Sequence, residues 1–173
     1  MKNWWVVLLA LLCFTAIANE AENYKLGAGD VIVIQVFGED ELKLETQLTD
    51  SGTTVNYPFL GTIKVVGMSI KELEQHVYNG LKPDYFVEPN VFVGIVQYRP
   101  FYIHGEVKKP GGYPYQPGMT VNQAIALAGG LTERASKEKI EISFEGDKNN
   151  AQTGTLNTKI SAGDTITIEQ RFF

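Results

Sequence analysis

The residue types that carry most protein chemistry are sparse in this sequence and form no catalytic pattern. The only histidines, His76 and His104, have no second histidine and no cysteine at the spacing of a metal site. The sequence has no G-x-S-x-G nucleophile motif and no G-x-x-x-x-G-K-[ST] phosphate loop, and the segment 27–29 lacks the third glycine of a dinucleotide loop. We therefore predict no catalytic residue, no metal ion and no cofactor.

Carboxylates occur in two settings. Glu39, Asp40 and Glu41 form an acidic cluster that could bind calcium or transfer protons, but it follows a strand-like run and we interpret it as a solvated loop. Asp30 and Asp164 each follow a glycine and precede a β-branched run. Aspartate at such a position commonly accepts hydrogen bonds from its own backbone, so we expect both side chains to fix turns.

A basic turn is the best candidate for a contact site. Proline and two glycines predict a turn over 108–112, and two lysines place positive charge on an otherwise acidic chain. The candidate residues for binding a partner or a glycan are Lys108, Lys109, Pro110, Gly111 and Tyr113. A solvated hairpin with no partner explains the same residues equally well, so both interpretations stay open.

Aromatic side chains are a second source of candidates, because they stack on sugar faces and anchor protein interfaces. A chain of this size also needs aromatics for its core, and we assign about two-thirds of them to packing. The residues concerned are Tyr24, Tyr57, Phe59, Tyr85, Phe86, Tyr98, Phe101, Tyr102, Tyr113, Tyr115, Phe172 and Phe173.

Composition and the first residues indicate an exported globular protein. The chain has 173 residues, 44% of them hydrophobic, and a net charge of -5, which excludes a disordered chain and disfavours nucleic acid as a partner. Residues 1–18 are typical of a secretory signal with cleavage between Ala18 and Asn19, although a permanent N-terminal anchor is an alternative. The single cysteine, Cys13, follows Leu11 and Leu12 rather than small residues, so we expect no acylation there. No disulfide is expected.

The elements predicted along the rest of the chain are short strands and two helices. Capping boxes at 69–72 and 120–123 predict helix starts, ended by Pro83 and by the glycines at 129–130. Strands are expected at 30–37, 53–56, 62–66, 91–98, 101–107, 140–144 and 164–169, the last two joined by a polar loop. This predicts an α+β protein of two small subdomains, 19–98 and 99–173. The echo of 28–34 in 162–168 fits two related halves or simply shared turn chemistry.

Several motifs together resemble the bacterial polysaccharide export (OPX) family. Residues 24–31 (YKLGAGDV), 36–38 (VFG), 57–61 (YPFLG), 67–69 (GMS) and 85–91 resemble its polysaccharide export domain. Residues 105–111 (GEVKKPG), Tyr113, 118–121 (GMTV) and 124–130 (AIALAGG) resemble an SLBB domain, a soluble-ligand-binding β-grasp. The resemblance implies an N-terminal mixed-sheet export domain followed by a β-grasp domain.

The resemblance also implies a function in transport of capsule, exopolysaccharide or biofilm polymers. Larger members carry a lipidated N-terminal cysteine and a C-terminal amphipathic helix that lines a pore, and this sequence matches neither feature. We therefore expect a non-enzymatic periplasmic ring or adaptor, peripheral to the outer membrane. Its expected partners are polysaccharide, other copies of the chain, an inner-membrane co-polymerase and a separate outer-membrane β-barrel channel.

Two alternatives come from other classes of protein. A glycan-binding module would use the second half without forming a conduit, and it could remain a monomer, whereas a conduit requires a closed ring. An envelope hydrolase or lyase would need paired carboxylates, and no recognisable motif supplies them.

Overall fold

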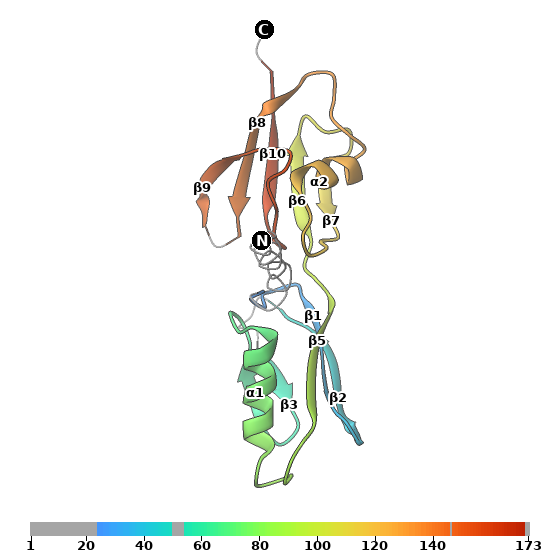
Figure 1. Cartoon of the computed structure of the whole chain (residues 1–173), viewed down its shortest axis with the longest axis vertical. Helices are drawn as coiled ribbons and strands as arrows, with labels where there is room; N and C mark the ends of the chain where they lie inside the picture. The colour runs from blue at the N-terminus through green and yellow to red at the C-terminus, as the bar shows by residue number, and fades with distance from the viewer. Residues whose placement is uncertain (1–23, 50–53, 146, 172–173) are drawn as a thin grey trace, which may run out of the picture.

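The computed structural model describes residues 24–49, 54–145 and 147–171. The predicted signal sequence, its cleavage site at Ala18 and Asn19, Cys13, and the terminal Phe172 and Phe173 lie outside the described residues. The described chain forms two halves stacked along the long axis of the molecule (Figure 1). The helices and strands of the described chain confirm the predicted α+β class.

The N-terminal half is an antiparallel sheet covered on one face. Its strands are ordered β2-β1-β5, with bounds β1 (Val31–Val36), β2 (Glu39–Gln47) and β5 (Val91–Gln97). Burial alternates along β1, so that Ile32, Ile34 and Val36 face the core. Helix α1 (Ile70–Leu81) and the hairpin of β3 (Thr54–Tyr57) and β4 (Gly61–Lys64) complete the half.

The predicted start of helix α1 is confirmed. Ser69 Oγ accepts a hydrogen bond from the Glu72 backbone N–H at 3.2 Å, and the Glu72 carboxylate accepts one from the Ser69 N–H at 2.6 Å. These bonds satisfy two backbone donors that a helix start leaves open. The helix then buries Leu73, Val77 and Leu81 against the sheet and ends before Pro83.

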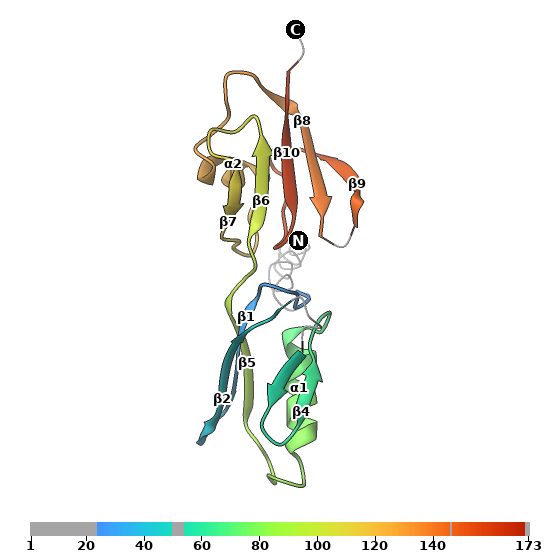
Figure 2. The same cartoon turned by 180° about the vertical axis from the view of Figure 1, so that it is seen from behind.

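The C-terminal half is a five-stranded mixed sheet ordered β7-β6-β10-β8-β9. Its elements are β6 (Phe101–Gly105), β7 (Gly111–Tyr113), α2 (Val121–Leu127), β8 (Ala135–Phe144), β9 (Asp147–Gly154) and β10 (Thr165–Gln170). Ala124 and Ala128 are fully buried, because small side chains let α2 lie close to the sheet. Figure 2 shows the opposite face of this sheet, over which no described helix lies.

Several predictions of local structure were wrong. Glu39, Asp40 and Glu41 begin strand β2 rather than a loop, although all three are exposed. The predicted polar loop between the last two strands contains β9, which pairs with β8. Gly111 and Gly112 lie in β7, so the turn precedes them.

The prediction of a mixed sheet in the N-terminal half was also wrong, because the mixed sheet lies in the C-terminal half. Both pairings of the N-terminal sheet are antiparallel, and among the described strands the parallel pairing joins β6 to β10 in the C-terminal half. None of the helices formed by the described residues is long and apolar enough to cross a lipid bilayer.

Candidate functional site

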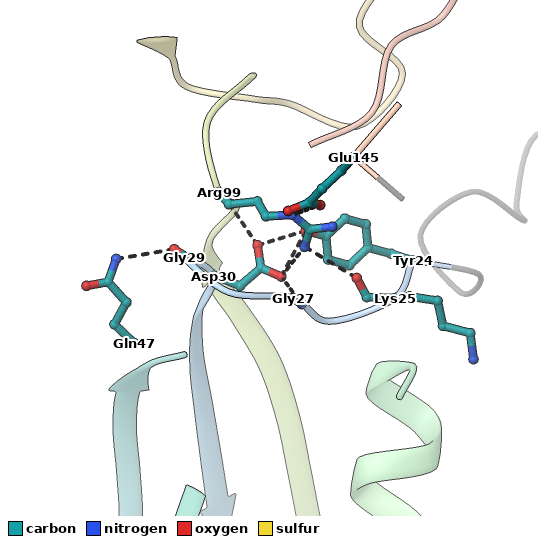
Figure 3. A network of polar contacts seen from close by, with 8 residues as sticks. All are labelled: Tyr24, Lys25, Gly27, Gly29, Asp30, Gln47, Arg99 and Glu145. Atoms are coloured by element: carbon teal, nitrogen blue, oxygen red, sulfur yellow. Dashed lines mark hydrogen bonds and ion pairs between the residues drawn. The ribbon is translucent and has the colours of Figure 1, made fainter. Parts of the chain in front are cut away.

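The two halves meet at Arg99, which lies in the short connection between β5 and β6 (Figure 3). The Arg99 backbone N–H donates to Oδ1 of Asp30 at 2.8 Å, and its Nη1 donates to Oδ2 of Asp30 at 2.8 Å. Nη1 also donates to the Tyr24 hydroxyl at 2.6 Å, and Nε donates to Oε2 of Glu145 at 2.6 Å. One side chain therefore contacts the start of the first half and the β8–β9 turn of the second.

Asp30 is the buried centre of this network. It is 0% exposed, and it also accepts hydrogen bonds from the Tyr24 hydroxyl at 2.7 Å and from the Gly27 N–H at 2.9 Å. A buried carboxylate is tolerated only when it is paired and fully hydrogen-bonded, and these donors meet that requirement.

The network changes the proton affinity of its members. Burial, and secondarily the hydrogen bond to Asp30, raises the pKa of Tyr24 above its ordinary value. Burial opposes the charged form of Arg99, yet the nearby Asp30 carboxylate produces a net rise in the pKa of the guanidinium. Both shifts keep the protons in place, so Tyr24 stays a donor and Arg99 stays a cation.

The repeated Gly-Asp segments of the sequence form matching turns at this junction. Oδ2 of Asp30 accepts from the backbone N–H three residues earlier, Gly27, and Oδ2 of Asp164 accepts from Ser161 in the same way at 2.7 Å. The preceding glycines have φ values of 97° at Gly29 and 86° at Gly163, in the left-handed region that favours glycine. The prediction that both aspartates fix turns is confirmed.

The chain passes between these two turns. The Arg99 backbone bonds to Asp30 on one side, while the Pro100 carbonyl accepts from the Gly163 N–H at 3.1 Å on the other. The next strand begins where the Tyr102 N–H donates to the Asp164 carbonyl at 2.8 Å. The connection is therefore held by backbone bonds to both halves rather than hanging between them as a free linker.

A cleft of about 500 Å³ opens at this junction. The N-terminal half contributes the segments 28–29 and 47–49, and the rest of the wall comes from Arg99, Pro100, Tyr102, Glu145, Gly163 and Thr165. Its volume falls within the range of about 300–1,000 Å³ typical of small-molecule sites. We refer to it below as the junction cleft.

The basic turn predicted as a contact site lies elsewhere, beside the end of α2. The Lys108 N–H donates to the Gly130 carbonyl at 3.0 Å, and the Lys109 N–H donates to the Ala128 carbonyl at 2.9 Å. Both lysine side chains and Pro110 are exposed, and the Tyr113 hydroxyl donates to the Lys109 carbonyl at 2.6 Å. The candidates Lys108, Lys109, Pro110, Gly111 and Tyr113 thus lie together, but none of them lines the junction cleft.

The predicted aromatic candidates separate into core and surface. Tyr57 and Phe101 are fully buried, and Tyr24, Phe86, Tyr98, Tyr113 and Tyr115 are partly buried. The exposed ones in the described part of the chain are Phe59, Tyr85 and Tyr102. Of these, Tyr102 lines the junction cleft, whereas the rings of Phe59 and Tyr85 lie 4.6 Å apart, centroid to centroid, in the N-terminal half.

Arg99 was missed by the sequence analysis, which treated it only as part of a boundary. Its ionic partners lie 69 and 46 positions away, so no local motif marks it.

As for metals, the described residues contain no group of three or more histidine, cysteine, aspartate or glutamate side chains arranged to hold an ion.

Comparison with known proteins gives matches over both halves. Residues 18–96 match the family described as polysaccharide biosynthesis/export protein, and residues 100–148 match the SLBB domain. The exopolysaccharide production protein ExoF of Rhizobium meliloti is 29% identical over 157 residues, covering 80% of this chain and 37% of ExoF. The EPS I polysaccharide export outer membrane protein EpsA of Ralstonia nicotianae is 26% identical over 186 residues, covering 88% and 49%.

A third relative, the polysialic acid transport protein KpsD of Escherichia coli, is 28% identical over 123 residues, covering 69% of this chain and 22% of KpsD. The chain thus spans about a fifth to a half of the length of these curated relatives.

Proposed function

The chain belongs to the bacterial polysaccharide export family, and on that premise we propose that it is a non-enzymatic component of a polysaccharide export machine. Within the machine it acts as a ring or adaptor between an inner-membrane co-polymerase and an outer-membrane channel. The observation that carries this proposal is the junction at Arg99, which ties the family's two domains together through a buried, fully paired carboxylate. We place the boundary between the domains at Tyr98 and Arg99.

Exposed apolar side chains on the N-terminal sheet support self-association. Phe37 and Phe92 lie 6.3 Å apart, centroid to centroid, and Val96 lies on the same edge strand, β5; all three are largely exposed. Edge strands and apolar patches on a protein surface favour pairing with another chain. We propose that this surface contacts the next copy in a ring.

A second apolar surface supports the proposal that the chain is an adaptor, because an adaptor must contact two kinds of protein. Phe59, Tyr85 and Val87 are exposed on the N-terminal half, and the Phe59 backbone has a φ of 65°, in a region that non-glycine residues rarely adopt. A strained backbone that presents an exposed phenylalanine is typical of a functional surface. We propose that this surface contacts a protein partner of the envelope, the co-polymerase or the channel.

The proposed location is the periplasm, peripheral to the outer membrane. It requires cleavage between Ala18 and Asn19 without acylation of Cys13. Intact-mass measurement on the periplasmic protein should give a chain that begins at Asn19 and carries no lipid. A diacylglyceryl group on Cys13 would contradict this location.

The test of the ring combines assembly with export. In a strain that lacks the chain, the wild type should restore polysaccharide export and should sediment as a closed oligomer. Phe92→Asp places a charge in the proposed interface, so it should give monomers and little export. Leu127→Asp is the matched control, since Leu127 is 48% exposed against 44% for Phe92 but lies on α2 in the other half.

The results of this test distinguish the ring or adaptor from the alternative function. A monomeric wild-type chain that still supports export would favour the alternative, a glycan-binding module that forms no conduit. Normal export in the strain that lacks the chain would contradict a function in export altogether.

A further inference from the structure

The junction cleft presents an aromatic ring at its wall. Tyr102 is 50% exposed, and a Cβ atom at Gly112 on the neighbouring strand β7 would lie 3.1 Å from the Tyr102 Cε1 atom. The ring therefore lies against a strand that carries no side chain at that point. An aromatic surface held in this way is suited to contact the C–H face of a sugar ring.

Around Tyr102 the cleft offers groups that match hydroxyls. Gln47 and Thr165 supply an amide and a hydroxyl, each able both to donate and to accept hydrogen bonds, and Glu145 supplies an acceptor. Gln47 is held toward the cleft by a hydrogen bond from its Nε2 to the Gly29 carbonyl at 3.3 Å (Figure 3). Gly29 and Gly163 also line the cleft, and the absence of side chains there leaves room for Arg99 and Glu145 to lie against both turns.

The charges at the cleft are mostly negative. Arg99 and Glu145 are the charged residues of its described lining, and the carboxylates of Asp30 and Asp164, buried outside that lining, also interact with the Arg99 guanidinium. Lys25, whose backbone carbonyl accepts a hydrogen bond from Arg99, directs its ammonium to Glu72 at 2.8 Å instead. The excess of negative charge disfavours an acidic sugar.

From this geometry we propose that the junction cleft is a binding subsite for an uncharged, hydroxyl-rich segment of saccharide. The inference rests on the proposed function, because the exported polymer would be the natural source of such a segment. Tyr102 stacks on the sugar ring, while Gln47, Thr165 and Glu145 bond its hydroxyls. A ligand there contacts both halves at once, so its binding depends on their relative orientation.

The test uses the purified protein with three defined probes, the neutral maltohexaose and cello-hexaose and the acidic hexagalacturonic acid. Amide resonances followed in ¹H–¹⁵N spectra should shift at Gly29 and Gly163 when maltohexaose is added. Hexagalacturonic acid should bind at least about tenfold more weakly, and Glu145→Gln should narrow that difference, because it removes one negative charge. Cello-hexaose serves as a second neutral probe with a different linkage.

A pair of matched tyrosine variants identifies the site. Tyr102→Ala should weaken maltohexaose about tenfold by removing the stacking surface, whereas Tyr85→Ala should change affinity less than about twofold. Tyr85 is the control because it is 49% exposed and lies outside the cleft. Denaturant unfolding of both variants checks that the comparison concerns binding and not folding.

Failure of this inference is distinguishable from failure of the proposed function. If neither neutral probe shifts Gly29 or Gly163, or if Tyr102→Ala binds as the wild type does, the subsite is wrong even where export depends on the chain. If the acidic probe binds more tightly than both neutral ones, the charge argument is wrong. If the cleft binds maltohexaose but loss of the chain leaves export normal, the export function is wrong and the binding site remains.

Discussion

Arg99 holds Asp30 from two directions, through its backbone N–H and through its guanidinium, each at 2.8 Å. Asp30 immediately precedes β1 of the N-terminal core, and Arg99 precedes β6 of the C-terminal core. The guanidinium is 13% exposed and the carboxylate 0%, so water competes little with the pair. The relative position of the two halves therefore depends on the ion pairs of Arg99 with Asp30 and Glu145 and on the hydrogen bonds that accompany them.

Replacing Arg99 should cost far more stability than replacing an exposed partner of an ion pair. Arg99→Ala leaves the Asp30 carboxylate buried without its cation, which we expect to lower the free energy of unfolding by about 3–5 kcal/mol. Lys25→Ala, which breaks the exposed pair with Glu72, should leave the free energy of unfolding nearly unchanged. Urea unfolding measures both, and similar losses for the two variants would contradict the central role of Arg99.

Arg99→Ala should also separate the unfolding of the two halves. Because each half has its own core, loss of the junction should turn one cooperative transition into two. Amide exchange followed residue by residue in the two cores should then give different midpoints for the two halves. A single shared midpoint in the variant would show that other contacts couple the halves.

Tyr24 should make the chain sensitive to alkali. Its pKa is raised above the ordinary 10.0, so the folded chain keeps the phenolic proton at a pH at which the unfolded chain has lost it. This contribution is fully present below about pH 10 and is lost as the pH rises further. Tyr24→Phe has no such proton, so its melting temperature should fall less steeply above pH 10, although at neutral pH it loses about 1–3 kcal/mol with the bond to Asp30.

The slope above pH 10 should decrease without vanishing, because burial also raises the pKa of Tyr57 and Tyr98. Tyr85→Phe, a change at an exposed tyrosine, is the control and should leave the slope as it is in the wild type. Equal slopes for the wild type and Tyr24→Phe would show that Tyr24 does not titrate abnormally.

Sequence reasoning succeeded where local chemistry determines structure. The start and end of α1 follow from Ser69, Glu72 and Pro83, which lie within or next to the helix they delimit. Strand β1 was found because its β-branched residues alternate between core and surface. In both cases the signal lies within the element itself, although β1 also pairs with the distant strand β5.

It failed where an element's own residues carry no apolar pattern or where the partners are distant. Strand β2 is rich in charge, and only Leu42 within it is buried, so the strand depends on backbone pairing with β1. Strand β9, an edge strand of polar sequence, likewise depends on pairing with β8. Arg99 was missed because its ionic partners lie 69 and 46 positions away, and the sequence signal for its site was the repeated Gly-Asp of the two turns that enclose it.

Gly105 should tolerate alanine much less well than Gly130 does. Both have positive φ, 85° and 92°, which costs an alanine about 1–2 kcal/mol. A Cβ at Gly105 would also collide with the Ile168 carbonyl oxygen, which accepts a hydrogen bond from the Glu106 N–H, whereas a Cβ at Gly130 meets nothing within 4 Å.

We therefore expect Gly105→Ala to lower the free energy of unfolding by about 2–5 kcal/mol and Gly130→Ala by about 1 kcal/mol. Chemical denaturation of the two variants under the same conditions gives the comparison. Equal losses would mean that the parallel pairing of β6 with β10 is loose enough at its end to admit a methyl group.

Reversing the charge of the basic turn should affect export more than stability. The fold uses the backbone N–H groups of Lys108 and Lys109, not their exposed ammonium groups, to fasten the turn to the end of α2. Changing both lysines to glutamate puts negative charge near the carbonyl end of that helix, which should cost about 1 kcal/mol in total and move the melting temperature only a few degrees. If the turn contacts an acidic partner or polymer, export should be abolished.

The matched control changes the same net charge elsewhere. Lys71→Glu combined with Lys137→Glu reverses two exposed lysines, one on α1 and one on β8, so it tests whether export simply responds to a more acidic protein. Loss of polysaccharide from the cell surface with the first pair alone would assign the contact to Lys108 and Lys109. Normal export with both pairs would leave the turn as a solvated connection, because charge reversal at a true electrostatic contact replaces attraction with repulsion.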